Sequence, residues 1–273
     1  MNIIQERYEI EKEINSGAFG RIYKGRDQKK GEPVAIKIEL PGSPSSLKYE
    51  VKILTYLFTN KVRNNIPAIL WYGIYSNVPC LIMTYYEYSL YDYLYHMSHT
   101  IPMRLANHWM NQIIGILENL HKVFLLHRDI KPQNIMIKSG DIHLIDFGLA
   151  TFYIDEKREH IPDISDKDRE NQSSESIIGS PKFASIRLHE GHRCSRRDDL
   201  ISTAYIYVYM LLNGITPWFS QNGQIKENKQ IDNFMTFLSK DIIWTQFLYY
   251  LDYVYQLSYD ELPNYDAMKQ LFI

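Results

Sequence analysis

The sequence predicts an α+β protein with two lobes, a β-rich amino-terminal lobe that contains one helix and a mainly α-helical carboxyl-terminal lobe. Strand-like runs separated by turns fill the chain up to about residue 84. Beyond about residue 88, apolar residues recur with the period of helices. A chain of 273 residues is also long for one hydrophobic core, and two lobes in one unit accommodate it.

The amino-terminal lobe is predicted to span residues 1 to about 84. The breakers of PGSPSS at 41–46 predict a loop, and apolar residues with helical spacing follow from Leu47 to Phe58. A Gly-rich turn at 15–20 separates the first two strands. The expected strands cover residues 8–14, 21–26, 34–40, 69–75 and 79–85.

A connector at about 84–88 leads into the second lobe, which runs from residue 89 to 273 within a single domain of residues 1–273. The longest apolar segment, Leu200–Leu212, is interrupted by polar residues and is too short to span a bilayer, so it predicts a buried helix. The polar stretch 163–176 predicts a mobile loop. The expected helices cover residues 90–97, 103–123, 198–212, 228–239, 241–257 and 264–272.

The composition is that of an ordinary globular chain, with 45% apolar and 23% charged residues. The net charge of −2, from 30 basic and 32 acidic residues, gives no global attraction to nucleic acid or membrane, so neither is expected as a partner. The two cysteines lie far apart, which fits a reducing compartment, and the charged start of the chain lacks the apolar core of a signal peptide. The expected location is therefore the cytoplasm, the nucleus or both.

Two short strings carry the strongest chemical signal. The first is HRDIKPQN at residues 127–134, and the second is Asp146-Phe147-Gly148. Asp129 is a candidate acceptor for a hydroxyl proton, while Asn134 and Asp146 are candidate ligands for the Mg²⁺ that neutralises a triphosphate. An apolar run and a turn separate the two strings, and a strand–turn–strand arrangement there would bring Asn134 and Asp146 to one side of a cleft.

A second group of residues suits phosphate binding. The segment NSGAFG at residues 15–20 lies between two expected strands and contains glycines where a backbone could approach phosphates closely. Compared with G-x-G-x-x-G, Asn15 occupies the first glycine position. Asn is the non-glycine residue best suited to a left-handed backbone, so we expect the turn to survive. A plain hairpin turn explains this segment about as well.

Lys37 is expected to point into the cleft, because apolar residues flank it on its strand. Glu50 on the following helix is its expected counter-charge, and Glu39 on the same strand is the alternative. The Lys37–Glu50 pair would orient the ammonium toward the α- and β-phosphates. Lys131 could place a positive charge beside the transferred phosphoryl group. Arg128 is expected to anchor the local backbone.

Taken together, these strings resemble the eukaryotic protein-kinase fold, which is bilobal, over essentially the whole chain. Lys131 lies two residues after Asp129, and in this feature the sequence resembles the serine/threonine class of protein kinases. The segments Gly179–Ile186 (GSPKFASI) and Ser195–Leu200 (SRRDDL) are similar to the casein kinase 1 family, in which Ser-Ile-Asn replaces the more common Ala-Pro-Glu. His160-Ile161-Pro162, Pro217-Trp218 and the final LPNYD…LF are similar to that family as well.

The resemblance implies a serine/threonine protein kinase that uses ATP and Mg²⁺. It would act as a monomer on protein substrates with acidic or phosphorylated residues near the target serine or threonine. The alternative is a pseudokinase, a nucleotide-binding scaffold that keeps the fold. The implied catalytic residues are Asp129, Lys131 and Asn134, and the implied metal ligands are Asn134 and Asp146. The implied ATP-binding residues are Ile14, Asn15, Gly17, Gly20, Ile22, Ala35, Lys37, Glu50, the gatekeeper Met83, and Thr84 and Tyr86 of the hinge.

The resemblance also implies roles for residues of the second lobe. Asp199 would fasten the catalytic loop from the buried helix beneath it. A substrate anion pocket would comprise Lys182, Gly214 and Lys226. Lys182 takes the place of an arginine and exchanges a bidentate fork for a point charge, so we expect weaker discrimination for phosphate. Arg187 stands where the family has the Asn of Ser-Ile-Asn.

Overall fold

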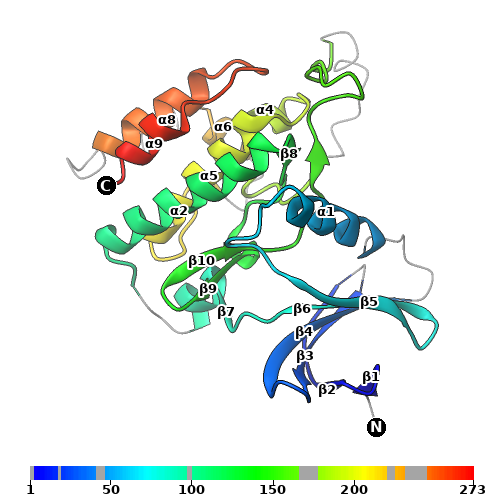
Figure 1. Cartoon of the computed structure of the whole chain (residues 1–273). Helices are drawn as coiled ribbons and strands as arrows, with labels where there is room; N and C mark the ends of the chain where they lie inside the picture. Colours follow the sequence, from blue (N-terminus) through cyan, green and yellow to red (C-terminus); the bar gives the residue numbers. More distant parts are fainter. Residues whose placement is uncertain are drawn as a thin grey trace.

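The computed structural model of the chain has two lobes, and the two termini lie in different lobes (Figure 1). An antiparallel sheet and one helix make up the first lobe, and helices dominate the second. The structure describes residues 3–17, 20–40, 47–96, 100–165, 178–219, 225–230 and 245–273.

A six-stranded antiparallel sheet forms the first lobe and is accompanied by α1 (Leu47–Thr59). Because successive side chains of a strand face opposite sides, Ile36 joins one apolar cluster while Ala35 shares another with Leu47 of α1. Lys37 therefore lies on the face that α1 covers. In spatial order the strands are β1 (Ile3–Ile4), β2 (Tyr8–Gly17), β3 (Gly20–Asp27), β4 (Glu32–Glu39), β6 (Val78–Thr84) and β5 (Ile69–Tyr75).

The second lobe is built around α5 (Arg196–Leu211), which is buried along almost its whole length. α2 (Met103–Lys122) and α8 (Thr245–Gln256) both contact α5, and α9 (Tyr265–Gln270) contacts α2. Their apolar side chains form one core that also contains Ile130 of the first string. Two short helices, α4 (Ile186–His189) and α6 (Ile225–Asn228), lie on either side of α5 in the sequence.

Two small sheets hold the loops that contain the two strings. β9 (Ile135–Lys138) and β10 (Asp141–Leu144) form an antiparallel hairpin, and β7 (Tyr88–Ser89) pairs with β9. β8 (Leu125–Leu126) pairs with β11 (Thr151–Phe152). The first string therefore runs between β8 and β9, and the second between β10 and β11.

The expected strands and most of the expected helices are confirmed, with displaced ends. The helix expected at 90–97 is confirmed in part: residues 90–96 are helical, but Asp92–His96 (η1) is a π-helix, and residue 97 lies outside the described residues. The preceding residues pair with β9, and the Asp92 carboxylate caps this helix by accepting hydrogen bonds from the backbone and hydroxyl of Ser89. The residues around 228 form the end of α6 instead of the start of a helix, and 231–240 lie outside the described residues.

Residues 166–177, most of the loop expected at 163–176, lie outside the described residues. The strand β1 and the helix α4 are elements that the sequence reasoning missed. Among the described helices, none combines the length and the apolar character that crossing a membrane requires.

Candidate active site

The loop that contains the first string is fastened by a buried carboxylate of α5. Asp199 accepts hydrogen bonds from the backbone N–H groups of His127 (2.8 Å) and Arg128 (2.9 Å), as expected. Its carboxylate also lies 3.2 Å from Nε2 of His121. Burial opposes the charge of Asp199, but these hydrogen bonds and His121 lower its pKa below the ordinary value. The carboxylate therefore stays ionised and fixes the loop from beneath.

His127 joins the loops of the two strings. Its Nε2 lies 3.1 Å from the carbonyl oxygen of Ile145, and its Nδ1 lies 3.3 Å from the backbone nitrogen of Asp129. Because the carbonyl only accepts, Nε2 carries the hydrogen and Nδ1 is the acceptor. Burial lowers the pKa of His127, which favours this neutral form. The ring thus sets the position of Asp129 relative to the residue that precedes Asp146.

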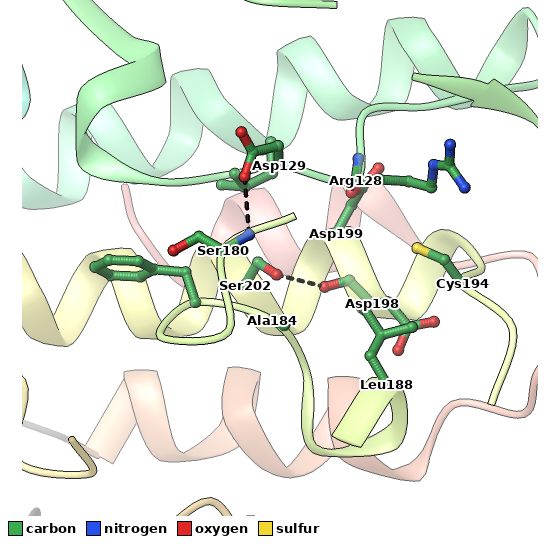
Figure 2. Close-up of a pocket in the computed structure, with 11 residues that line it drawn as sticks. Arg128, Asp129, Ser180, Ala184, Leu188, Cys194, Asp198, Asp199 and Ser202 are labelled. Atoms are coloured by element: carbon green, nitrogen blue, oxygen red, sulfur yellow. Dashed lines mark hydrogen bonds between the residues drawn. The ribbon is translucent and has the colours of Figure 1, made fainter. Parts of the chain in front are cut away.

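Three donors hold the Asp129 carboxylate. Lys131 Nζ lies 2.5 Å and Asn134 Nδ2 lies 2.9 Å from Oδ2. The backbone N–H of Ser180 donates to Oδ1 at 3.1 Å, and Figure 2 shows the two residues facing each other. Sequence reasoning missed Ser180, because a backbone contact between residues 51 positions apart leaves no signal in the residue type. The carboxylate is oriented from two directions.

Asn134 and Asp146 lie at the same end of the β9–β10 hairpin. Asn134 ends the short 3₁₀ turn η2 (Pro132–Asn134), and its carbonyl oxygen accepts a 2.9 Å hydrogen bond from the backbone N–H of Ile145. The strand–turn–strand arrangement predicted between the two strings is confirmed. Asp146 has a left-handed backbone, with φ of 67°. Lys37 lowers the pKa of Asp146, against the opposing effect of burial.

The donor set fits a divalent cation that also binds phosphates. Both hydrogen bonds of the Asn134 side chain use Nδ2, so its Oδ1 remains as an oxygen ligand beside the Asp146 carboxylate. Among the described residues, no group of three or more His, Cys, Asp or Glu side chains could hold a metal ion. A cation at Asn134 and Asp146 would therefore take its other ligands from phosphate and water, as Mg²⁺ commonly does.

Lys37 forms the ion pair that the sequence predicted. Its Nζ lies 2.8 and 2.9 Å from the two carboxylate oxygens of Glu50 and 3.3 Å from Oδ1 of Asp146. Burial opposes the charge of Lys37, but the two carboxylates raise its pKa above the ordinary value. The alternative partner, Glu39, is turned to α1, where it accepts a 2.7 Å hydrogen bond from the N–H of Leu47. Glu39 thus stabilises the start of the helix that carries Glu50.

Two adjoining cavities of about 350 and 410 Å³ form a cleft between the lobes, and Asn15, Ile22 and Lys37 line both. Glycines and the carboxylates of the two strings line the first cavity, the hinge lines the second, and apolar residues line both. The first is also lined by Gly17, Gly20, Glu50, Asp129, Lys131 and Asp146. The second is also lined by Ile14, Ala35, Met83, Thr84, Tyr86 and, missed from sequence, Ser89, Asp92 and Gln133.

Asn15 differs from its expected conformation. It lies in β2 opposite Ile22 of β3, and its φ is not positive. The expectation of a left-handed backbone at Asn15 is wrong, because β2 continues to Gly17 and pairs with Gly20. An extended strand accepts Asn without backbone strain. The turn itself, at residues 18–19, lies outside the described residues.

Of the three residues of the expected anion pocket, the structure describes the surroundings of Lys182 and Gly214. Lys182 is half-buried with Nζ 4.7 Å from the centre of the Phe219 ring, and burial lowers its pKa. Gly214 has φ of 87° and its N–H donates to the carbonyl oxygen of Tyr209 at 2.8 Å, which ends α5. That N–H is therefore committed to the helix end. Lys226 belongs to α6, and its side chain lies outside the described residues.

Arg128 of the first string and residues after the second string connect the site to the second lobe. Arg128 donates from Nε to the carbonyl oxygen of Leu149 at 2.6 Å, which confirms its anchoring role. Arg187, at the position of the family Asn, donates to the carbonyl oxygen of Tyr255 at 2.9 Å, close to the end of α8. The hydroxyl of Ser185 donates to the buried carboxylate of Asp198. These contacts hold the segment that approaches Asp129 against the helical core.

In a comparison with protein-family models, residues 8–260 match the model of the protein kinase domain. The matched residues include the whole cleft, both strings and α5. The β-sheet lobe and the helical lobe are those of the bilobal kinase fold.

Proposed function

Because the chain belongs to the protein kinase family, we propose that it is an active, casein kinase 1-like serine/threonine kinase. The observation that carries this proposal is the Asp129 carboxylate, oriented by Lys131, Asn134 and Ser180 at one end of the cleft. Such a carboxylate is placed to receive a hydroxyl group, and the groups needed for phosphates lie beside it.

ATP use, usually with a divalent metal, is implied by the protein kinase domain itself. The proposed adenine end is the cavity lined by Met83, Thr84 and Tyr86. Lys37 would bind the α- and β-phosphates, held in place by Glu50. Asn134 and Asp146 would hold Mg²⁺, which supplies positive charge to the phosphate oxygens.

In the proposed transfer, Asp129 accepts the proton of a serine or threonine hydroxyl, and the oxygen of that hydroxyl bonds to the γ-phosphorus. The bond between that phosphorus and the β–γ bridging oxygen breaks, and ADP leaves. Lys131, 2.5 Å from Asp129, lies where its ammonium can also neutralise the equatorial oxygens of the transferred group. Besides Mg²⁺, the proposed reaction therefore uses charged side chains that are described along the cleft.

The proposed substrates are proteins with acidic or phosphorylated residues near the target hydroxyl. Lys182 supports this preference, because it lies two residues from Ser180, which contacts Asp129. Gly214 and Lys226 complete the proposed pocket by resemblance. The proposed setting is a cytoplasmic or nuclear monomer, and light scattering after gel filtration tests the oligomeric state.

A peptide-array assay with Mg-ATP tests the proposal, with Asp129→Asn as the inactive control. We expect transfer to serine or threonine, strongest in peptides with acidic or phosphorylated neighbours, and loss of transfer in the control. The rival function is a nucleotide-binding scaffold, favoured by Asn15 in the roof of the cleft. Stabilisation by nucleotide without transfer to any peptide would establish the scaffold instead.

A further inference from the structure

Lys229 is a fully buried lysine, with 0% of its surface exposed, in the residues that follow α6. Its Nζ lies 2.8 Å from the carbonyl oxygen of Pro181 and 2.5 Å from that of Ala184. It also lies 4.7 Å from the centre of the Tyr205 ring. Within the described part of the chain no carboxylate pairs with it, and burial lowers its pKa well below the ordinary value.

The two carbonyl groups belong to a segment whose other end touches the catalytic carboxylate. The N–H of Ser180 donates to Asp129 at 3.1 Å, one residue before Pro181. Between the two carbonyls that Lys229 binds, the carbonyl oxygen of Lys182 accepts a 2.7 Å hydrogen bond from Trp218 Nε1. Residues 180–184 are thus held at Asp129 on one side and at the helical lobe on the other.

The backbone of Lys229 is held as firmly as its side chain. The hydroxyl of Tyr255 on α8 donates to the carbonyl oxygen of Lys229 at 3.0 Å, and the same hydroxyl lies 2.7 Å from that of Tyr205 on α5. A methionine would fill a similar volume without burying a polar group. What the amine adds is its hydrogen bonds to the carbonyls of Pro181 and Ala184 and its 3.4 Å contact with Nε2 of His189.

We infer that Lys229 is a positioning residue for the peptide substrate, because it fixes the backbone of residues 181–184, which follows the contact of Ser180 with Asp129. The inference rests on the proposed kinase function and deepens it. Because Ser180 contacts Asp129, a peptide whose hydroxyl reaches Asp129 would approach this segment. The positive charge of Lys182 then favours the binding of acidic peptides only, whereas Lys229 supports the binding of every peptide.

Lys229→Met tests this inference by steady-state kinetics with one acidic and one neutral peptide. We expect KM to rise about tenfold for both peptides, because the hydrogen bond to each carbonyl is lost. KM for ATP and kcat are expected to stay within about twofold of the original protein. Lys182→Met is expected to raise KM more for the acidic peptide than for the neutral one. Lys122→Met, on the exposed end of α2, is the matched control.

Two further measurements separate the outcomes. Tyr255→Phe removes one hydroxyl that holds Lys229 and is expected to raise peptide KM in the same direction but less, which decides the matter if Lys229→Met does not fold. Anisotropy of a labelled peptide compares binding even if the original protein transfers no phosphate, an outcome that would overturn the proposed function alone. An unchanged peptide affinity in both variants, or a parallel loss of nucleotide affinity, would overturn the positioning role.

Discussion

The phenol hydroxyl of Tyr49 donates a 2.8 Å hydrogen bond to the backbone carbonyl oxygen of Ala150. Tyr49 precedes Glu50 on α1, and Ala150 lies four residues after Asp146. Lys37 pairs with both Glu50 and Asp146. The hydrogen bond therefore connects the helix that contains Glu50 to the segment that contains Asp146. It links the two lobes beside the proposed phosphate site.

Tyr49→Phe is expected to lower kcat several-fold, because α1 and its carboxylate lose a tie worth about 1 kcal/mol. The side chain is 36% exposed, so the fold should survive the loss of one hydroxyl. Steady-state kinetics with saturating ATP and peptide measure the effect. Tyr249→Phe, on the exposed face of α8, is the control. Equal kcat in the two variants would show that the tie has no role in the reaction.

Gly179→Ala is expected to lower kcat strongly. The backbone of Gly179 has φ of 91°, and an added Cβ would lie 2.4 Å from the carbonyl oxygen of Arg128. The segment must then move away from Asp129. Gly140→Ala is the matched control, because Gly140 has φ of 87° but open space around its Cβ position.

Both alanine variants suffer the same unfavourable backbone conformation, of about 1 kcal/mol or more. The clash is the difference between them. We therefore expect both to lose thermal stability, but Gly179→Ala alone to lose activity at a temperature where both are folded. Comparable activity of the two folded variants would show that the close approach of Gly179 to Arg128 is not needed for the reaction.

The stability of the protein is expected to fall as the pH falls below about 6.5, partly through His127. Burial lowers the pKa of His127 in the folded chain, so the unfolded chain binds a proton that the folded chain does not. The stabilisation is present above the ordinary pKa of 6.5 and is lost below it, by at most about 1.4 kcal/mol per pH unit.

Urea unfolding between pH 5.5 and 8 measures this dependence. His127→Phe keeps an aromatic ring beside Phe147, which His127 contacts at 5.0 Å between ring centres, but cannot bind a proton. We expect a less stable protein with a flatter pH dependence. His96→Phe replaces a histidine whose side chain is 62% exposed and should keep the original slope. An unchanged slope in His127→Phe would contradict the buried neutral imidazole.

Lys182→Glu is expected to lower activity selectively on acidic or phosphorylated peptides, because a like charge then faces the substrate. The same direction is expected for Lys226→Glu if its side chain belongs to the pocket. The measurement is the ratio of kcat/KM for matched acidic and neutral peptides. Equal losses on both peptides would show that neither lysine reads acidic residues.

The sequence predicted those parts of the fold and site that depend on local pattern. Alternation and helical spacing located the strands and α1, α2 and α5, because these elements bury one face or are wholly buried. The order of the two strings predicted the hairpin between Asn134 and Asp146. The pairing of Lys37 with Glu50 was predicted because a buried ammonium needs a counter-charge.

Other features depend on contacts between distant residues and could not be predicted. Asn15 is extended because of its pairing with Ile22, which residue type alone does not specify. Ser180 contacts Asp129 through its backbone, and every residue type offers that group. Lys226 was chosen from the family resemblance, and Lys229 was overlooked because its burial depends on contacts with distant residues such as Pro181, Ala184 and Tyr255.

The central claim is that this cleft transfers a phosphoryl group, and Asp146→Asn tests it most directly. The variant replaces the charged carboxylate of the proposed Mg²⁺ site with a neutral amide of almost the same shape. In a radiometric assay with Mg-ATP and the best peptide of the array, we expect transfer to fall at least about a hundredfold while the folded structure persists by circular dichroism. Undiminished transfer by the folded variant would contradict the account.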